Sequence, residues 1–267
     1  MNSPEITVFN IGLLPADLSK WFGLAAAHPY SGRADNLPMQ CYLIRLPGRL
    51  VLVDAPAYEF PGDDSMLIPE YKGRSAASLL TASGISPDEI TDVIITHPHL
   101  DHTLGLSRPV GDPLEPVFPN ARHYLGARDW DPEKMEEAER LPLEVLQQAG
   151  LLTLVDGPTD LGDGLTLLPA PGETPGHQIL WLKGGQEMGD AYFVGDLFHH
   201  TFEFDELGRH PVWADAQALE ASKLMLAERA ASSDARIFFT HIKGACRVER
   251  KGSQPGLYHF TVEQERL

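Results

Sequence analysis

The chain has 267 residues, of which 43% are hydrophobic, and this is enough apolar material for a substantial core, so a disordered protein is excluded. Its 38 acidic and 21 basic residues give a formal charge of −17, which disfavours binding to nucleic acids and to anionic membrane surfaces. The sequence shows neither a signal peptide nor an apolar run of the roughly 20 residues that span a membrane. We therefore predict a cytoplasmic protein with no nucleic-acid partner and no membrane partner.

The first part of the chain is predicted to consist mainly of strands. Apolar runs at residues 6–12, 40–46 and 50–56 indicate three strands, the last two joined by a turn at Pro47 and Gly48. Cys41 lies inside the second run and is predicted to be a buried strand residue. A helix is expected near residues 75–83, followed by strands at 92–97 and 121–126.

A longer helix is predicted within residues 129–150. Asp131 is a typical N-cap, Pro132 would occupy the first helical position, and Pro142 is expected to kink or split the helix. The segments rich in glycine and proline at residues 61–64 and 108–119 are predicted to be surface loops.

The second part repeats this order. Strands are predicted at 151–155, 165–170, 178–183 and 191–196, then a helix at 215–231 and a strand at 235–241. Two similar halves, each with helices outside a sheet, predict sheets packed face to face. We therefore predict one α+β domain over residues 1–267, a four-layer αββα sandwich with pseudo-halves at about 1–150 and 151–267.

The segment THPHLDH, residues 96–102, places four possible metal ligands directly after a buried strand. They are His97, His99, Asp101 and His102. Three further ligand-type residues follow or accompany other apolar runs, namely His177 in GETPGH, Asp196 in AYFVGD and His241 in RIFFTH. Imidazole and carboxylate groups held at strand ends favour a metal site.

The set HPHLDH, GETPGH, VGD and FFTH resembles the metallo-β-lactamase-fold hydrolases, and within them most closely the quorum-quenching N-acyl homoserine lactonases. The resemblance extends from about Val8 to His241 and implies the αββα fold. It implies that one divalent metal ion is bound by His97, His99 and His177, and a second by Asp101, His102 and His241. Asp196 would bridge the two ions. Zinc is the expected metal, with Mn, Fe and Co as alternatives.

The resemblance also implies roles for two other residues. Asp54, at the end of LVLVD, would accept a hydrogen bond from the metal-site loop and orient ligands; the alternative is an ordinary turn aspartate. His99 occupies a position where the oxygen-reducing di-iron members carry glutamate, so it favours hydrolysis over redox chemistry.

The predicted function is a metal-dependent hydrolase that opens a lactone of the acyl-homoserine-lactone type by attack of a metal-bridging hydroxide. Asp101 would relay a proton to the departing alkoxide. The lactonases carry a tyrosine three residues after the bridging aspartate, and this chain has His199 there. We predict that His199 donates a hydrogen bond to the developing oxyanion, the alternative being an exposed loop histidine.

A small-molecule ester with an apolar part is the expected substrate. Aromatic residues in the segments 21–30 and 197–204 would line its pocket, namely Trp21, Phe22, Phe198 and Phe202. The alternative is that these rings belong to the core or to the interface of a homodimer.

Other activities remain open. A thioesterase of the hydroxyacylglutathione type would need a basic anchor, for which Lys243 and Arg247 are candidates. An organophosphate triesterase would need only the aromatic pocket above two metals. An iron persulfide dioxygenase would use His97, His99 and His177 around a single iron, and a non-catalytic binding protein would use none of this chemistry.

Overall fold

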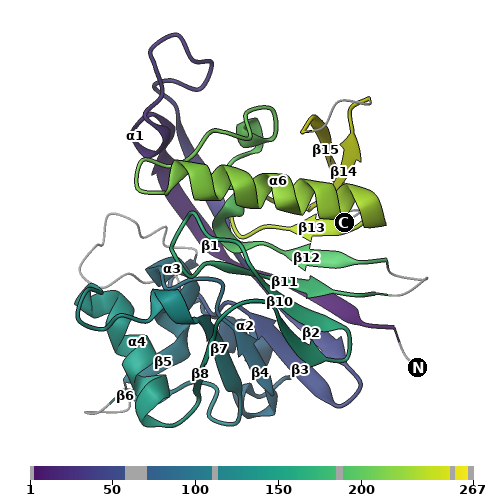
Figure 1. The fold of residues 1–267 in the computed structure, drawn as a ribbon. Helices are drawn as coiled ribbons and strands as arrows, with labels where there is room; N and C mark the ends of the chain where they lie inside the picture. The colour runs from purple at the N-terminus through teal and green to yellow at the C-terminus, as the bar shows by residue number, and fades with distance from the viewer. Residues whose placement is uncertain (1–2, 58–70, 110–113, 185–188, 253–255, 264–267) are drawn as a thin grey trace. The chain divides into compact units, whose positions relative to one another are not determined.

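The computed structural model describes residues 3–57, 71–109, 114–184, 189–252 and 256–263 (Figure 1). The chain forms two compact units. The first comprises Met1–Gly12 and Met39–Gly157, and the second comprises Leu13–Pro38 and Pro158–Leu267. A segment near the N-terminus therefore belongs with the second part of the sequence.

The first unit is built on a sheet with the strand order β1-β2-β3-β4-β7-β8. The strands β2 and β3 are antiparallel, whereas β3, β4, β7 and β8 are parallel to one another. The elements are β1 (Glu5–Asp17), β2 (Ala34–Leu46), β3 (Arg49–Val53), α2 (Ala76–Ala82), η3 (Pro87–Glu89), β4 (Asp92–Ile94), α3 (Leu100–Thr103), η4 (Leu104–Leu106), β5 (Ser107–Pro109), β6 (Leu114–Pro116), β7 (Arg122–Gly126), η5 (Ala127–Asp129), α4 (Glu137–Gln148) and β8 (Leu152–Val155).

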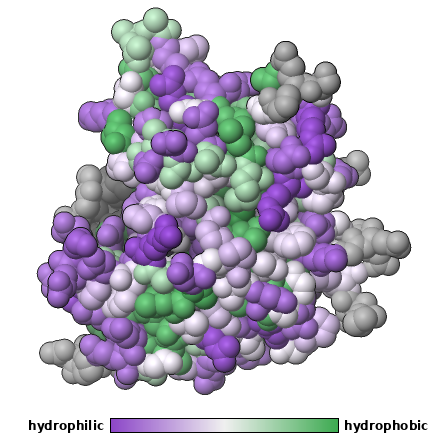
Figure 2. All heavy atoms as spheres, viewed as in Figure 1, coloured by the Kyte–Doolittle hydropathy of each residue, from purple (hydrophilic) through white to green (hydrophobic). Residues whose placement is uncertain are grey.

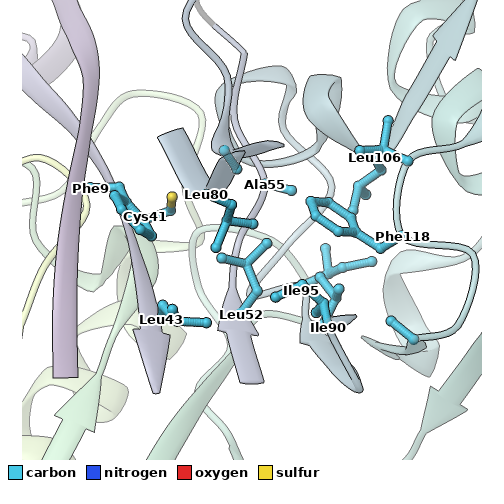
Figure 3. Close-up of a cluster of buried hydrophobic side chains, with 14 of the residues drawn as sticks. Phe9, Cys41, Leu43, Leu52, Ala55, Leu80, Ile90, Ile95, Leu106 and Phe118 are labelled. Carbon is cyan, nitrogen blue, oxygen red and sulfur yellow. The ribbon is translucent and has the colours of Figure 1, made fainter. Parts of the chain in front are cut away.

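The core of the first unit explains why these runs form strands. Consecutive residues of β3 and β4 are buried, which is typical of parallel strands covered on both faces. Figure 3 shows Cys41, Leu52, Leu80 and Phe118 pointing into one apolar cluster. Cys41 is buried and reduced, as predicted, and burial raises the pKa of its thiol.

One prediction about the helix in residues 129–150 is wrong, and a second is wrong in part. Asp131 is not its N-cap, because the chain after it closes only a turn, in which the amide of Met135 donates to the Asp131 carbonyl at 3.1 Å. The helix α4 starts later, after Glu136, whose backbone is extended. Pro142 lies inside α4 without splitting it. Leu143 and Leu146 pack into the core, and this burial outweighs the roughly 3 kcal/mol that an interior proline costs.

The segments predicted to be loops give mixed results. Residues 61–64 lie outside the described residues. Residues 108–119 are not entirely irregular, because β5 and β6 pair as antiparallel strands within this stretch. The helix predicted near residues 75–83 is confirmed as α2. Ser75 and Ser78 form a reciprocal capping box at its N-terminus.

The second unit is built on a sheet with the strand order β15-β14-β13-β12-β11-β10-β9, in which only the pair β12 and β13 is parallel among the described pairings. The sequence pattern did not predict β9, β14 and β15. The elements are α1 (Leu18–Phe22), β9 (Thr159–Gly162), β10 (Leu165–Pro169), β11 (Gln178–Leu182), β12 (Ala191–Phe193), η6 (Gly195–Leu197), η7 (Thr201–Phe204), α6 (Ala216–Ser233), β13 (Arg236–Phe238), β14 (Ala245–Arg250) and β15 (Tyr258–Glu263).

The helix α6 lies along this sheet (Figure 1). Its N-cap Asp215 accepts a hydrogen bond from the amide of Ala218, and it ends at Asp234 in the left-handed conformation. Leu219 and Leu226 pack from the helix onto the apolar face of the strands. The helix predicted from residue 215 is confirmed.

The visible surface is mostly hydrophilic with smaller apolar patches (Figure 2), in keeping with the acidic composition. None of the helices in the described residues is both long and apolar enough to cross a membrane.

Candidate metal centre

The first unit carries a cluster of four ligand-type residues, His97, His99, Asp101 and His102, which we name the first half-site. It begins where β4 ends, and His99 immediately precedes the short helix α3. His97 and His102 are fully buried. The cluster is therefore local in sequence and held by a buried strand on one side and a helix on the other.

The nitrogen atoms within the first half-site converge. Nε2 of His97 lies 2.9 Å from Nδ1 of His99, and the two rings are 4.4 Å apart between centroids. Nε2 of His102 lies 3.8 Å from a carboxylate oxygen of Asp101. Two imidazole nitrogens at this distance either share a proton or present their lone pairs to a common cation.

Asp54 forms hydrogen bonds with the loop that carries the first half-site. Its carboxylate accepts hydrogen bonds from the Thr96 amide at 2.8 Å and from the Thr96 hydroxyl at 2.9 Å. It also lies 2.8 Å from Nδ1 of His102. Nδ1–H of His102 therefore donates to the carboxylate, and Nε2 keeps its lone pair. The hydrogen bond predicted between Asp54 and this loop is present.

The backbone around Asp54 is constrained. Asp54 has a positive φ of 59°, which aspartate tolerates better than most residues. The amide of Gly105 donates to the carbonyl of the next residue, Ala55, at 2.7 Å. A Cβ on Gly105 would lie 2.5 Å from that carbonyl oxygen. Gly105 therefore allows the segment after β3 to approach the segment after α3.

The second unit carries His177, Asp196 and His241 together with Glu173, which we name the second half-site. Nδ1 of His177 donates to the Ala170 carbonyl at 3.1 Å, and Nδ1 of His241 donates to the Pro38 carbonyl at 2.9 Å. Nε2 of His177 accepts from the Asp196 amide at 3.3 Å, so it carries no proton. Both histidines thus present Nε2 as the basic atom.

Asp196 lies at the centre of the second half-site. One carboxylate oxygen is 3.4 Å from Nε2 of His241, and the other is 3.2 Å from Nε2 of His199. Ligand atoms of Glu173 also lie within 4.8 Å of Asp196. Asp196 follows β12 in η6, where Gly195 takes a positive φ of 50° to turn the chain.

His199 is buried, so its interpretation as an exposed loop histidine is wrong. Its Nε2 faces both Asp196, at 3.2 Å, and Glu173, at 3.8 Å. Burial acts to lower the pKa of His199, but the two carboxylates outweigh this effect and leave the pKa above its ordinary value. Nδ1 finds no hydrogen-bond partner among the described residues.

Two of the four aromatic residues predicted to line a pocket contact His199, and a third packs on one of these two. Trp21 and Phe22 each meet the His199 ring edge-on, with centroids 6.0 and 6.1 Å away, and Phe202 packs on Phe22 at 4.9 Å. Phe198 does not join them. It lies fully buried in the core of the second unit against Phe204, Phe239 and Phe260, because its side chain leaves the segment on the opposite side from His199. Its placement in a substrate pocket is therefore wrong.

The sequence analysis missed two residues here, Glu173 and Trp213. Glu173 is buried and stands in the same GETPGH motif as His177, so its proximity to a predicted ligand was the available signal. Trp213 is 46% exposed, donates from Nε1 to Glu173 at 2.6 Å, and lies 5.4 Å from Trp21 between ring centroids. No local pattern marks it, because its contacts are made by segments distant in sequence.

The donor set fits divalent metal ions. Neutral imidazoles and carboxylates are the ligands that Zn, Mn, Fe and Co share. His102, His177 and His241 are each held through Nδ1 by an acceptor, which leaves Nε2 for a metal in all three. The described residues therefore offer His, Asp and Glu groups suited to metal binding in each unit.

The named proteins to which this chain is similar share only low sequence identity with it. The N-acyl homoserine lactonase AiiA of Bacillus thuringiensis subsp. kurstaki is 25% identical over 186 residues, which cover 66% of this chain and 70% of the relative. The metallo-beta-lactamase domain-containing protein 1 of Xenopus laevis is 26% identical over 206 residues, which cover 75% and 78% of the two chains.

Solved structures share the fold over nearly the whole chain. The dizinc quorum-quenching lactonase AidC superposes with a TM-score of 0.76 at 18% identity, covering 99% of this chain and 96% of AidC. The hydrolase AbOPH superposes with a TM-score of 0.78 at 19% identity, covering 100% and 96%. These likenesses confirm the predicted α+β fold class.

The family model of the metallo-beta-lactamase superfamily matches residues 35–241, which include every predicted metal ligand. This match confirms the resemblance inferred from HPHLDH and the three later motifs, and with it the prediction of a metal-dependent hydrolase. The chain belongs to the metallo-β-lactamase superfamily.

Proposed function

We propose that this protein is a lactonase, a dinuclear metal hydrolase that opens a cyclic ester of the acyl-homoserine-lactone type. The observation that carries the proposal is the tautomer of His102, His177 and His241: in each, Nδ1 lies against an oxygen acceptor, so Nε2 is the basic nitrogen, in a chain of this superfamily. Relatives named as N-acyl homoserine lactonases support the substrate class.

In this proposal His97, His99 and His177 would hold one divalent ion, Asp101, His102 and His241 would hold a second, and Asp196 would serve both. When bound, two such ions polarise an ester carbonyl and bring the pKa of a coordinated water near neutrality. Zinc is the expected metal, supported by the dizinc neighbour, and Mn, Fe and Co share the same ligands.

Side chains of the protein handle the protons and the substrate oxygen. Asp101 retains partial exposure, 13% of its side chain, and relays a proton to the departing alkoxide. His199 hydrogen-bonds the carbonyl oxygen, and Asp196 and Glu173 beside Nε2 hold its ring in place. In this role His199 takes the place of the tyrosine of the lactonases.

An aromatic rim receives the apolar part of the substrate. Trp21, Phe22 and Trp213 surround His199, and Trp213 is half-exposed although its N–H is bound to Glu173. A tryptophan that is both exposed and held in place suits contact with an acyl chain.

The basic anchor that a glutathione thioester would need is less available. Arg247, one of the two candidates, is paired with Glu263 at 2.6 Å and with Asp234 at 2.9 Å. Lys243, the other candidate, is exposed, so the thioester stays the alternative substrate. The predicted cytoplasmic location and homodimer stay predictions from the sequence.

Ring opening measured by mass spectrometry tests the proposal. Protein loaded with Zn or Mn is incubated with a short-chain and a long-chain acyl-homoserine lactone, and the expected product has gained one water. Chelator treatment and Asp196→Asn should both abolish the gain. The proposal fails if protein that holds two metals per chain leaves both lactones intact. A glutathione thioester and an aryl phosphotriester, run in parallel, identify the alternative substrate.

A further inference from the structure

A buried ion pair joins η7 to α6 in the second unit. Nζ of Lys223 lies 2.5 Å from one carboxylate oxygen of Glu203, and neither side chain has exposed surface. Lys223 also donates to the Arg209 carbonyl at 2.7 Å and stands 4.8 Å above the centre of the Phe198 ring. Burying two charges costs several kcal/mol for each ion unless partners compensate it, so such a pair demands explanation.

The other carboxylate oxygen of Glu203 binds the backbone beside the candidate metal centre. It accepts the amide of His199 at 2.8 Å and the amide of His200 at 2.9 Å. One carboxylate thus fixes two consecutive peptide groups, the first of which belongs to the histidine that contacts Asp196. The orientation of His199 is set through its backbone as well as through its ring.

The same helix also holds the segment that carries Glu173. The hydroxyl of Ser222, the residue before Lys223, donates to the Pro171 carbonyl at 2.7 Å. The amide of Asp215 donates to the Gly172 carbonyl at 2.8 Å. Adjacent residues of α6 therefore anchor both segments whose side chains meet at His199.

Capping alone does not account for Glu203. It completes a capping box with His200 at the start of η7, and this explains its bond to the His200 amide. The bond to the His199 amide lies outside that box, and an ordinary cap requires neither complete burial nor a buried lysine. Replacing a buried ion pair by apolar residues is often neutral or stabilising, so stability alone does not require the pair.

We propose that Glu203 is a positioning residue for the reaction. Its carboxylate oxygen holds the His199 amide, and with it the ring, in the orientation that engages the substrate, while Lys223 compensates the buried charge of that carboxylate. The inference rests on the proposed function for its kinetic consequence. Its structural content, that the acceptor oxygen of residue 203 fixes the His199 ring, is independent of the substrate.

Two double variants separate positioning from stability. Glu203→Gln with Lys223→Met removes both charges but keeps an oxygen that accepts the two amides. Glu203→Met with Lys223→Met removes the same charges and that oxygen as well. We expect the first to retain kcat for the lactone, and the second to lower kcat by about 10- to 100-fold with little change in KM. Both are assayed at equal metal content, with circular dichroism to verify folding.

A spectroscopic measurement does not depend on activity. In protein labelled with ¹⁵N-histidine, the imidazole signals of His199 are assigned by their loss in His199→Gln. We expect these signals to keep their positions in the double variant Glu203→Gln with Lys223→Met, and to shift or broaden in Glu203→Met with Lys223→Met. Unchanged His199 signals in both folded variants, or equal kcat in both, would overturn the inference. If the wild-type protein opens no lactone, the proposed function fails, and the histidine signals still decide the positioning role.

Discussion

The carboxylate of Asp54 lies 2.8 Å from Nδ1 of His102, and both side chains are almost completely buried. Asp54 follows β3 and His102 ends the HPHLDH motif, so the contact spans 48 residues of sequence. This pair sets which nitrogen of His102 is protonated, and it gives an aspartate with a positive φ a buried hydrogen-bond partner in the candidate metal centre.

Asp54→Asn should weaken metal binding by about 10- to 100-fold, because the amide cannot stabilise the Nδ1–H tautomer of His102 as the carboxylate does. Asparagine also tolerates a positive φ, so the fold should persist. Competition with a chelator measures the affinity. Asp163→Asn, at another residue with a positive φ but on an exposed turn, is the matched control and should bind metal as the wild type does. Equal affinities in the two variants would exclude this role for Asp54.

Acid should destabilise the protein through His123. Burial lowers the pKa of this histidine to about 4, below its ordinary value of 6.5. The unfolded chain therefore takes up a proton first as the pH falls, and stability present above pH 6.5 is lost between 6.5 and about 4. The loss amounts to about 3 kcal/mol.

Urea unfolding at several pH values tests this expectation. Nδ1 of His123 bonds the Ala121 carbonyl at 3.1 Å, whereas Nε2 has no partner among the described residues. His123→Leu should show a smaller decrease in stability between neutral and acid pH, whatever its stability at pH 7. All other titratable groups are the same in both proteins, so the difference between the two curves isolates His123. Parallel curves would contradict the assignment.

Phe198→Ala should reduce the free energy of unfolding by about 3–5 kcal/mol, because it removes a ring from the packed core of the second unit. The KM for a long-chain lactone should be unchanged. Trp213→Phe is expected to behave in the opposite way, altering KM or kcat with little effect on the melting temperature, since Trp213 is half-exposed. A raised KM with unchanged stability in Phe198→Ala would return Phe198 to the substrate pocket.

Gly172→Ala should be strongly destabilising. A Cβ at this position would lie 2.3 Å from the Cα of Leu219, and the backbone φ is +142°. Since the nearest atoms belong to the backbone of α6, we expect a loss of about 3 kcal/mol or more from overpacking and strain. Gly150→Ala, where φ is also positive but nothing lies within 4 Å of the new Cβ, should lose only about 1 kcal/mol. Thermal unfolding monitored by circular dichroism compares the two, and similar melting temperatures would argue against tight packing at Gly172.

The sequence by itself determined the strands that precede the candidate ligands. The HPHLDH motif can be recognised because its residues are close together in the sequence. An apolar run such as DVII is expected to be buried in any fold of the chain. The helix from Asp215 was predictable for the same reason, since its cap and its apolar positions are neighbours in sequence. The sequence identified Asp54 as a candidate at the end of its strand, but it did not predict that Asp54 lies next to His102.

Tertiary structure alone decided the features that depend on distant segments. Pro142 stays inside α4 because Leu143 and Leu146 find a core, and Phe198 turns into the core while His199 turns toward Asp196. Glu173 and Trp213 bond across 40 residues, and Lys223 reaches Glu203 across 20. Local periodicity carries no information about such pairs, because the energy that fixes them comes from burying unlike segments of the chain against one another.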